Sequence, residues 1–85
     1  MGRAVVRYYP DADALVAELS DEPIVDEELL DNDIVVSYGR SGKVVRIEIL
    51  DASRRGLLEA VKQLLTHRTD PAVQVVKELG IAQPT

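Results

Sequence analysis

The segment from residue 34 to residue 50 constrains the fold most, because apolar side chains recur at every second position on both sides of a turn. The turn has the sequence Gly-Arg-Ser-Gly at residues 39–42, with glycines where a positive φ is expected. The apolar positions that would share one face are Ile34, Val36, Tyr38, Val45, Ile47 and Ile49. The alternation and the turn together predict a β-hairpin.

A helix is expected directly after this hairpin. Asp51 or Ser53 would cap its first turn. Arg55 and Glu59 stand four residues apart and would pair on its exposed side. The apolar residues that follow helical spacing and would face the sheet are Leu57, Leu58, Val61, Leu64 and Leu65. A sheet covered on one face by a helix is a two-layer α+β domain, which is the fold class we expect.

The N-terminal part predicts further strands. Residues 3–9 alternate, and Pro10 and Asp11 supply turn chemistry. Residues 14–19 also alternate, although this short run fits a helical turn as well. The acidic connector at residues 20–32 should contain a short strand or helical turn, because structureless loops of that length are uncommon. We therefore expect an antiparallel sheet of about four strands arranged as two hairpins.

A second, shorter helix is expected near the C-terminal end. Asp70 is a preferred N-cap, Pro71 a preferred first helical residue, and Gly80 a suitable stop. Its apolar face would consist of Ala72, Val75, Val76 and Leu79. We assign residues 1–68 to one α+β domain and residues 69–85 to a helical tail. The tail would be weak alone, so it should dock on its own domain or on a second chain.

Size and composition restrict the function classes. The chain has 85 residues, no cysteine and one histidine, His67, which excludes disulfides, thiolate metal sites and a multi-histidine site within one chain. A core this small gives marginal stability, and oligomerisation is the remaining common way to increase it. We therefore expect a dimer or a larger homo-oligomer. No secretion signal or membrane-spanning run is recognised, so we expect a cytoplasmic protein.

The net charge of −5 is unevenly distributed. Residues 10–36 contain ten acidic residues and no Lys or Arg, whereas the chain from residue 37 onward has eight basic and five acidic residues. A solvated surface is the simpler interpretation, and docking of a small basic protein is the sharper one. Nucleic-acid binding is not expected, because the domain is acidic and has few aromatic residues. The candidate interaction surface consists of Glu27, Glu28, Val75, Val76 and Leu79.

Three segments of the chain form one recognisable pattern. They read Tyr-Tyr-Pro-Asp-Ala-Asp-Ala-Leu at 8–15, Leu-Ser-Asp-Glu-Pro at 19–23, and Ile-Glu-Ile-Leu-Asp-Ala-Ser-Arg-Arg at 47–55. Over residues 4–56 the chain resembles the YuzE-like family of small bacterial and archaeal proteins, a domain of unknown function. The resemblance implies an antiparallel sheet followed by a helix, and it favours a strand at 14–19. It implies no established activity, although some members resemble partners in toxin–antitoxin-like gene pairs.

Polar residues near the predicted turns are the candidates for a chemical site: Asp11, Asp13, Glu48, Asp51, Ser53 and Arg54. Asp11 and Asp13 form an Asp-x-Asp pair, but the further ligands and the glycine of a calcium loop do not follow, so turn formation is the better interpretation. Ser53 as a nucleophile would need a nearby base, and His67 lies about four helical turns away. We assign no catalytic residue, metal or cofactor.

Two hypotheses of different classes follow. The first is a non-catalytic protein-interaction module that forms homo-oligomers and acts as an antitoxin-like partner of another small protein. The alternative is a small-ligand or metal-binding protein, or an enzyme, whose polar site forms between subunits around Asp11, Asp13, Glu48, Asp51 and Arg54.

Overall fold

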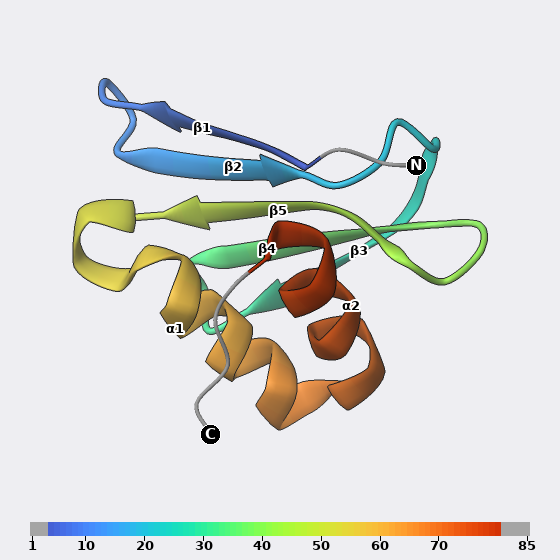
Figure 1. Ribbon diagram of the computed structural model, residues 1–85. Coiled ribbons are helices and arrows are strands. Elements are labelled where there is room, and N and C mark those ends of the chain that lie inside the picture. The colour runs from blue at the N-terminus through green and yellow to red at the C-terminus, as the bar shows by residue number, and fades with distance from the viewer. Residues whose placement is uncertain (1–3, 81–85) are drawn as a thin grey trace.

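The computed structural model describes residues 4–80 as a five-stranded antiparallel sheet with two helices on one face (Figure 1). The strands follow the order β1-β2-β5-β4-β3, so β1 and β3 form the two edges. This architecture confirms the α+β fold class. Arg3 and residues 81–85, which the predicted first strand and tail included, lie outside the described residues. The elements are β1 (Val5–Tyr9), β2 (Ala14–Glu18), β3 (Ile24–Leu30), β4 (Ile34–Gly39), β5 (Val44–Leu50), α1 (Ala52–His67) and α2 (Thr69–Leu79).

The sheet has five strands instead of about four, because much of the acidic connector forms β3. This strand runs antiparallel to β4, with Glu27 opposite Ser37 and Leu30 opposite Ile34. Acidic residues are depleted in strands, and the run Asp26-Glu27-Glu28 lacks the apolar alternation from which a strand is predicted. They are tolerated here because an edge strand keeps its charged side chains in contact with water.

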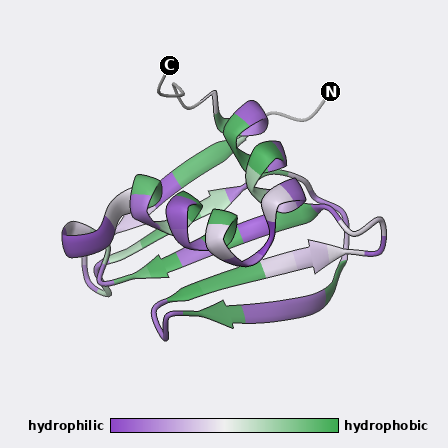
Figure 2. Ribbon diagram, turned by 90° about the horizontal axis from the view of Figure 1, so that it is seen from below, coloured by the Kyte–Doolittle hydropathy of each residue, from purple (hydrophilic) through white to green (hydrophobic). Residues whose placement is uncertain are grey.

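The core lies between the sheet and the helices and is largely aliphatic. The predicted hairpin at 34–50 forms as β4 and β5, which occupy the middle of the sheet together with β2. Figure 2 shows both helices on one side and no helix on the other, which we call the bare face. The largest fully buried side chains are Leu19, Ile34, Ile47, Ile49, Leu64, Val36, Val44 and Val75.

Helix α1 is interrupted after its first turn. Gly56 has φ 74° and ψ 171°, a non-helical conformation that is essentially restricted to glycine. Beyond this break Val61 and Leu64 are buried, but Leu58 and Leu65 are 63% and 45% exposed. The predicted apolar stripe was therefore too wide, because Leu58 and Leu65 lie about 100° further around the helix than the residues before them.

The break at Gly56 coincides with a different partner for Arg55. Its Nη1 lies 2.6 Å from Asp31 Oδ2, and its Nε donates a hydrogen bond of 3.0 Å to Asp33 Oδ2. Glu59 instead accepts a 3.3 Å bond from Gln63. The predicted Arg55–Glu59 pair is wrong, because the side chain of Arg55 reaches the turn between β3 and β4.

Helix α2 packs on the same core as α1. Ala72 and Val75 are fully buried. The helix begins at Thr69 with Arg68 as its N-cap, so the prediction that Asp70 is the cap was wrong. Asp70 lies within the first turn, where a negative charge favours the helix dipole. Gly80 ends the helix with φ 68°, as predicted.

Gln74 joins α2 to an irregularity in the sheet. The pairing of β4 with β5 shifts register next to Val44. The side-chain amide of Gln74 accepts a 2.7 Å hydrogen bond from the Val44 N–H and donates a 2.9 Å bond to the Val44 carbonyl. One side chain thus satisfies both backbone polar groups of a buried residue, as a neighbouring strand would.

Candidate functional site

The six predicted polar residues do not form one cluster. Asp13 and Ser53 are in direct contact where β5 passes into α1, and Asp51 and Arg54 form a pair at the same junction. Asp11 and Glu48 instead line a depression on the bare face. The structure therefore separates the predicted cluster into a junction and a surface depression.

At the junction, Asp13 caps α1 from a distant part of the chain. Its Oδ1 accepts a 3.1 Å bond from the Ser53 N–H, and its Oδ2 accepts a 2.8 Å bond from the Ser53 hydroxyl. Its carbonyl also accepts a 2.9 Å bond from the Ala52 N–H. Asp51 occupies the N-cap position, as one of the two predicted residues, but among the described residues its side chain makes no cap bond. The capping side chain comes from the β1–β2 turn instead.

The backbone at the junction is unusual at two positions. Asp13 has φ 50° and Asp51 has φ 58°, both in the left-handed region. Aspartate tolerates this region better than most residues, because its short side chain forms local hydrogen bonds. The two aspartates therefore allow the tight approach of the β1–β2 turn to the start of α1.

Tyr8 completes the hydrogen bonding of Asp13. Its hydroxyl donates a 2.7 Å bond to Asp13 Oδ1. This bond, together with those from Ser53, lowers the pKa of Asp13, and it also raises the pKa of Tyr8. Both shifts favour a charged carboxylate that accepts hydrogen bonds. Such a carboxylate suits a structural cap better than a general base.

Asp51 and Arg54 form an ion pair at the surface of the junction. Arg54 Nη1 lies 2.9 Å from Asp51 Oδ2, and the two side chains are 80% and 41% exposed. Exposed pairs of this kind contribute little to stability because water screens them. The pair adds no catalytic geometry to the junction.

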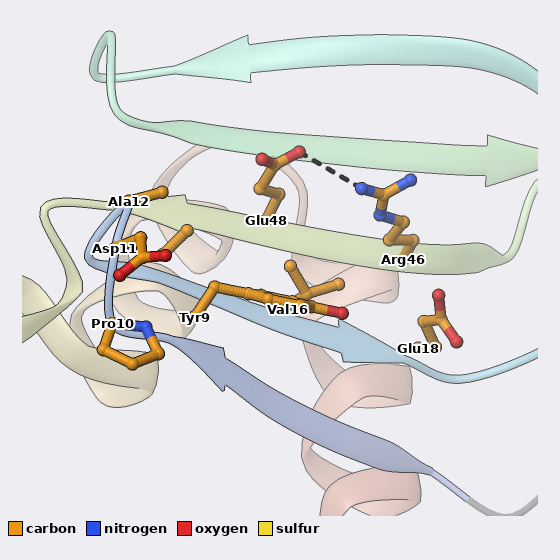
Figure 3. A pocket seen from close by; sticks show the side chains of 9 residues that line it. Tyr9, Pro10, Asp11, Ala12, Val16, Glu18, Arg46 and Glu48 are labelled. Atoms are coloured by element: carbon orange, nitrogen blue, oxygen red, sulfur yellow. Dashed lines mark hydrogen bonds and ion pairs between the residues drawn. The ribbon is translucent and has the colours of Figure 1, made fainter.

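The depression on the bare face has a volume of about 470 Å³ and is lined by residues of β1, β2, β5 and the first turn (Figure 3). Arg46 Nη2 lies 3.4 Å from Glu48 Oε1, and Arg46 Nε is buried without a hydrogen-bond partner among the described residues. Figure 3 shows Tyr9 lying beside Val16 on the floor of the depression. Asp11 and Glu18 complete its polar lining.

The residues of the predicted interaction surface do not lie together on the outside of the protein. Val75 is fully buried, which corrects its assignment to a surface, and Val76 and Leu79 are partly buried against the core. Glu27 accepts a 3.4 Å bond from the Ser37 hydroxyl. Glu28 accepts a 2.9 Å bond from the Tyr38 hydroxyl.

The Tyr38–Glu28 bond belongs to a small group at the start of α2. Arg68 Nη1 lies 3.6 Å from Glu28, and the Arg68 guanidinium lies 4.9 Å from the centroid of the Tyr38 ring. Burial, followed by the bond to Glu28, raises the pKa of Tyr38. These contacts join α2 to the β3 edge, so Glu28 has a structural role.

Within residues 4–80, no three His, Asp or Glu side chains gather closely enough to hold a metal ion. None of the described helices is both long and apolar enough to cross a membrane.

The strand β1 was predicted, but its exposure at an edge of the sheet was not. All five of its residues are exposed. Val5 and Tyr9 point to the bare face, and Val6 and Tyr8 point to the helix side, yet each keeps 41–50% of its surface in water. The signal was present in the sequence Val-Val-Arg-Tyr-Tyr, since a strand that is apolar on both faces normally has cover on both.

Most of the junction residues lie in a region of the chain that matches a protein-family model. A family model described as "Protein of unknown function (DUF2283)" matches residues 6–53, more than half of the chain. The chain belongs to this family. The DUF2283 region includes both Asp13 and Ser53, and α2 lies beyond it. No curated protein and no solved structure matches the chain.

Proposed function

We propose that this DUF2283 protein is a non-catalytic protein-interaction module that forms homo-oligomers through the edge strand β1. The exposure of β1 is the observation that supports the proposal. An edge strand presents unpaired N–H and C=O groups on its outer side, and these groups can bind another strand. In β1 they are flanked by exposed Val6 and Tyr8 on one face and by exposed Val5 and Tyr9 on the other.

The two edges of the sheet differ in how they are protected. Edge strand β3 carries Asp26, Glu27 and Glu28 in succession, and its pairing with β4 is irregular between Ile24 and Asp26. Charges and bulges of this kind discourage pairing at an edge. Edge strand β1 has one charged residue, Arg7, and its register with β2 is regular throughout. The unprotected edge is therefore the better surface for assembly.

Light scattering and sedimentation over a range of concentrations test this proposal. The wild-type protein should associate at micromolar concentration, and Val6→Lys should weaken association by roughly tenfold, because each copy that pairs through β1 loses the apolar contact of Val6. Val25→Lys on β3 is the matched control, since Val25 is 55% exposed and Val6 is 48% exposed. A wild-type protein that stays monomeric at high micromolar concentration would remove the proposal.

The acidic edge supports a second interaction, with a small basic protein. We propose that β3 and the residues beside it bind such a partner in an antitoxin-like role. We also propose that the chain is YuzE-like within its family and that it acts in the cytoplasm. Asp26 and Glu27 are exposed, and both belong to the acidic stretch of the chain. Charge reversal at Asp26 should weaken a complex isolated at moderate salt, and reversal at Asp70 should not. Equal loss in both variants would argue against β3 as the contact.

The depression on the bare face favours one alternative, binding of a small polar ligand. The observation that supports it is the Nε of Arg46, which is buried and has no hydrogen-bond partner within residues 4–80. Thermal-shift measurements with divalent cations and a panel of metabolites test it, because a ligand that binds only the folded state raises the unfolding temperature. A genuine ligand should lose its effect in Arg46→Gln. An unchanged melting temperature across the panel would argue against this alternative.

A further inference from the structure

We infer that two copies of this protein pair their β1 strands antiparallel about a two-fold axis at Arg7, which joins two five-stranded sheets into one continuous sheet. The inference rests on the proposed function and specifies its partner and its register. Val5 then faces Tyr9 of the second copy, Val6 faces Tyr8, and Arg7 faces Arg7. The partner is a second copy of this chain, because β1 is complementary to itself when it is reversed.

The self-complementarity holds on both faces of the strand. Alternation places Val5, Arg7 and Tyr9 on the bare face and Val6 and Tyr8 on the helix side. In the proposed register each valine of one copy therefore lies opposite a tyrosine of the other. Pairs of an aromatic and a β-branched residue across neighbouring antiparallel strands are stabilising. A shift by one residue would place Arg7 opposite Val6 or Tyr8 and would turn the helices of the two copies to opposite faces of the sheet.

In this register the two Arg7 side chains lie opposite each other, and their like charges repel. An acidic residue on the bare face, Glu18, offsets this repulsion. Arg7 pairs with Val16 of β2, and Glu18 lies diagonally next to it on the same face. A long side chain can span that diagonal distance of about 7–8 Å between antiparallel neighbours. Neither Arg7 nor Glu18 has an ion-pair partner within the described part of one copy. Each guanidinium can therefore turn toward the Glu18 of its own copy.

The other edge does not offer an equivalent surface. Pairing β3 with its own copy would bring Asp26, Glu27 and Glu28 of both chains together, and like charges on opposing strands are destabilising. Pairing β1 of one copy with β3 of the next would match charges better. It would also leave free edges at both ends, so it would build open-ended chains instead of a closed dimer. The irregular pairing between Ile24 and Asp26 works against such chains.

Cysteine cross-linking tests the register directly, because the chain contains no cysteine of its own. In Arg7→Cys, the two Cα atoms would be about 4.5–5.5 Å apart, which suits a disulfide. Val5→Cys is the matched control on the same face, because its two copies would be separated by four residues, or about 13–14 Å. Val25→Cys on β3 measures how much covalent dimer forms through random collisions between molecules. We expect rapid oxidation to a covalent dimer in Arg7→Cys alone, reversed by a reductant.

Mixing wild-type protein with Arg7→Glu gives an independent test that does not depend on oxidation. Arginine opposite glutamate replaces two like-charged pairs, so native mass spectrometry of an equimolar mixture should show the mixed dimer well above its statistical share of one half, with each homodimer below one quarter. Circular dichroism of each variant confirms that it is folded.

The possible outcomes separate the register from the proposed function. If the wild type is dimeric but Val5→Cys cross-links, or if the mixed dimer has only its statistical share, the register is wrong and the proposed function stands. A monomeric wild type would overturn both. If the mass of the assembly keeps rising with protein concentration, the protein forms open-ended chains through β1 and β3, and the closed dimer is wrong.

Discussion

The carboxylate of Asp13 binds both the backbone N–H and the hydroxyl of Ser53, a residue forty positions later in the chain. These bonds join the turn between β1 and β2 to the first turn of α1. Each of the two residues lies in one of the sequence segments that carry the family resemblance. The association of these segments therefore has a physical explanation that requires no catalysis, since one supplies the helix cap of the other.

Replacing Asp13 should destabilise the fold more than replacing its neighbour Asp11. Asp13→Ala removes the acceptor for two Ser53 donors and for the Tyr8 hydroxyl. Ser53→Ala, which removes one donor, should cost about 1 kcal/mol of unfolding free energy. Urea titration followed by circular dichroism measures these changes. Asp11 has an exposed side chain, so Asp11→Ala serves as control, and equal midpoints for Asp11→Ala and Asp13→Ala would contradict the cap.

The same carboxylate should make stability depend on pH in the acid range. Hydrogen bonds from Tyr8 and Ser53 lower the pKa of Asp13 from its ordinary value of 3.8. The contribution to folding is thus fully present above that value and is lost as the pH falls through the lowered pKa. The stability gap between the wild type and Asp13→Asn should be largest near neutral pH and should narrow below pH 4. A gap that stays constant down to pH 2 would show that the charged form is not the one favoured by folding.

Adding a methyl group at Gly56 should destabilise the protein by about 1–3 kcal/mol. Apart from the adjoining residues and the backbone of its own helix, no described atom lies within 4 Å of the new Cβ, so the cost comes from the backbone conformation. Gly80→Ala is the matched control, because φ 68° and ψ 29° at Gly80 lie in the left-handed helical region, which other residues can enter at a cost of about 1 kcal/mol. Thermal or urea unfolding compares the two. A smaller loss for Gly56→Ala would indicate that the break in α1 relaxes to a regular helix.

Shortening Val75 should test whether α2 belongs to the folding unit. Val75 is fully buried and Val73, on the same helix, is 41% exposed. Val75→Ala should cost about 2 kcal/mol, since it removes buried methyl groups from a packed core, whereas Val73→Ala should change stability by less than about 0.5 kcal/mol. Urea unfolding measures both losses. The dependence of the unfolding free energy on urea concentration, the m value, is fitted as one value shared by the variants. Similar small losses for both would mean that α2 undocks without consequence.

Regular periodicity made much of this fold predictable. The hairpin at β4 and β5 was recognised because apolar residues such as Ile47 and Ile49 alternate with polar ones around a glycine turn. The location of β3 was less clear, because Asp26, Glu27 and Glu28 interrupt the pattern that a half-buried strand normally shows. An acidic strand is stable only at an edge, and whether a strand lies at an edge is a property of the sheet order.

Local evidence in the sequence was enough to predict the β4–β5 hairpin, the strand before Pro10, the end of α2 at Gly80 and an aliphatic core free of cysteine. The partners of the polar side chains follow from the tertiary arrangement alone. Asp13 binds Ser53, Arg55 binds Asp31 and Asp33, and Gln74 binds Val44. The reason is physical. Periodicity reports which face of an element is buried, whereas a hydrogen bond between distant residues depends on how separate elements are placed.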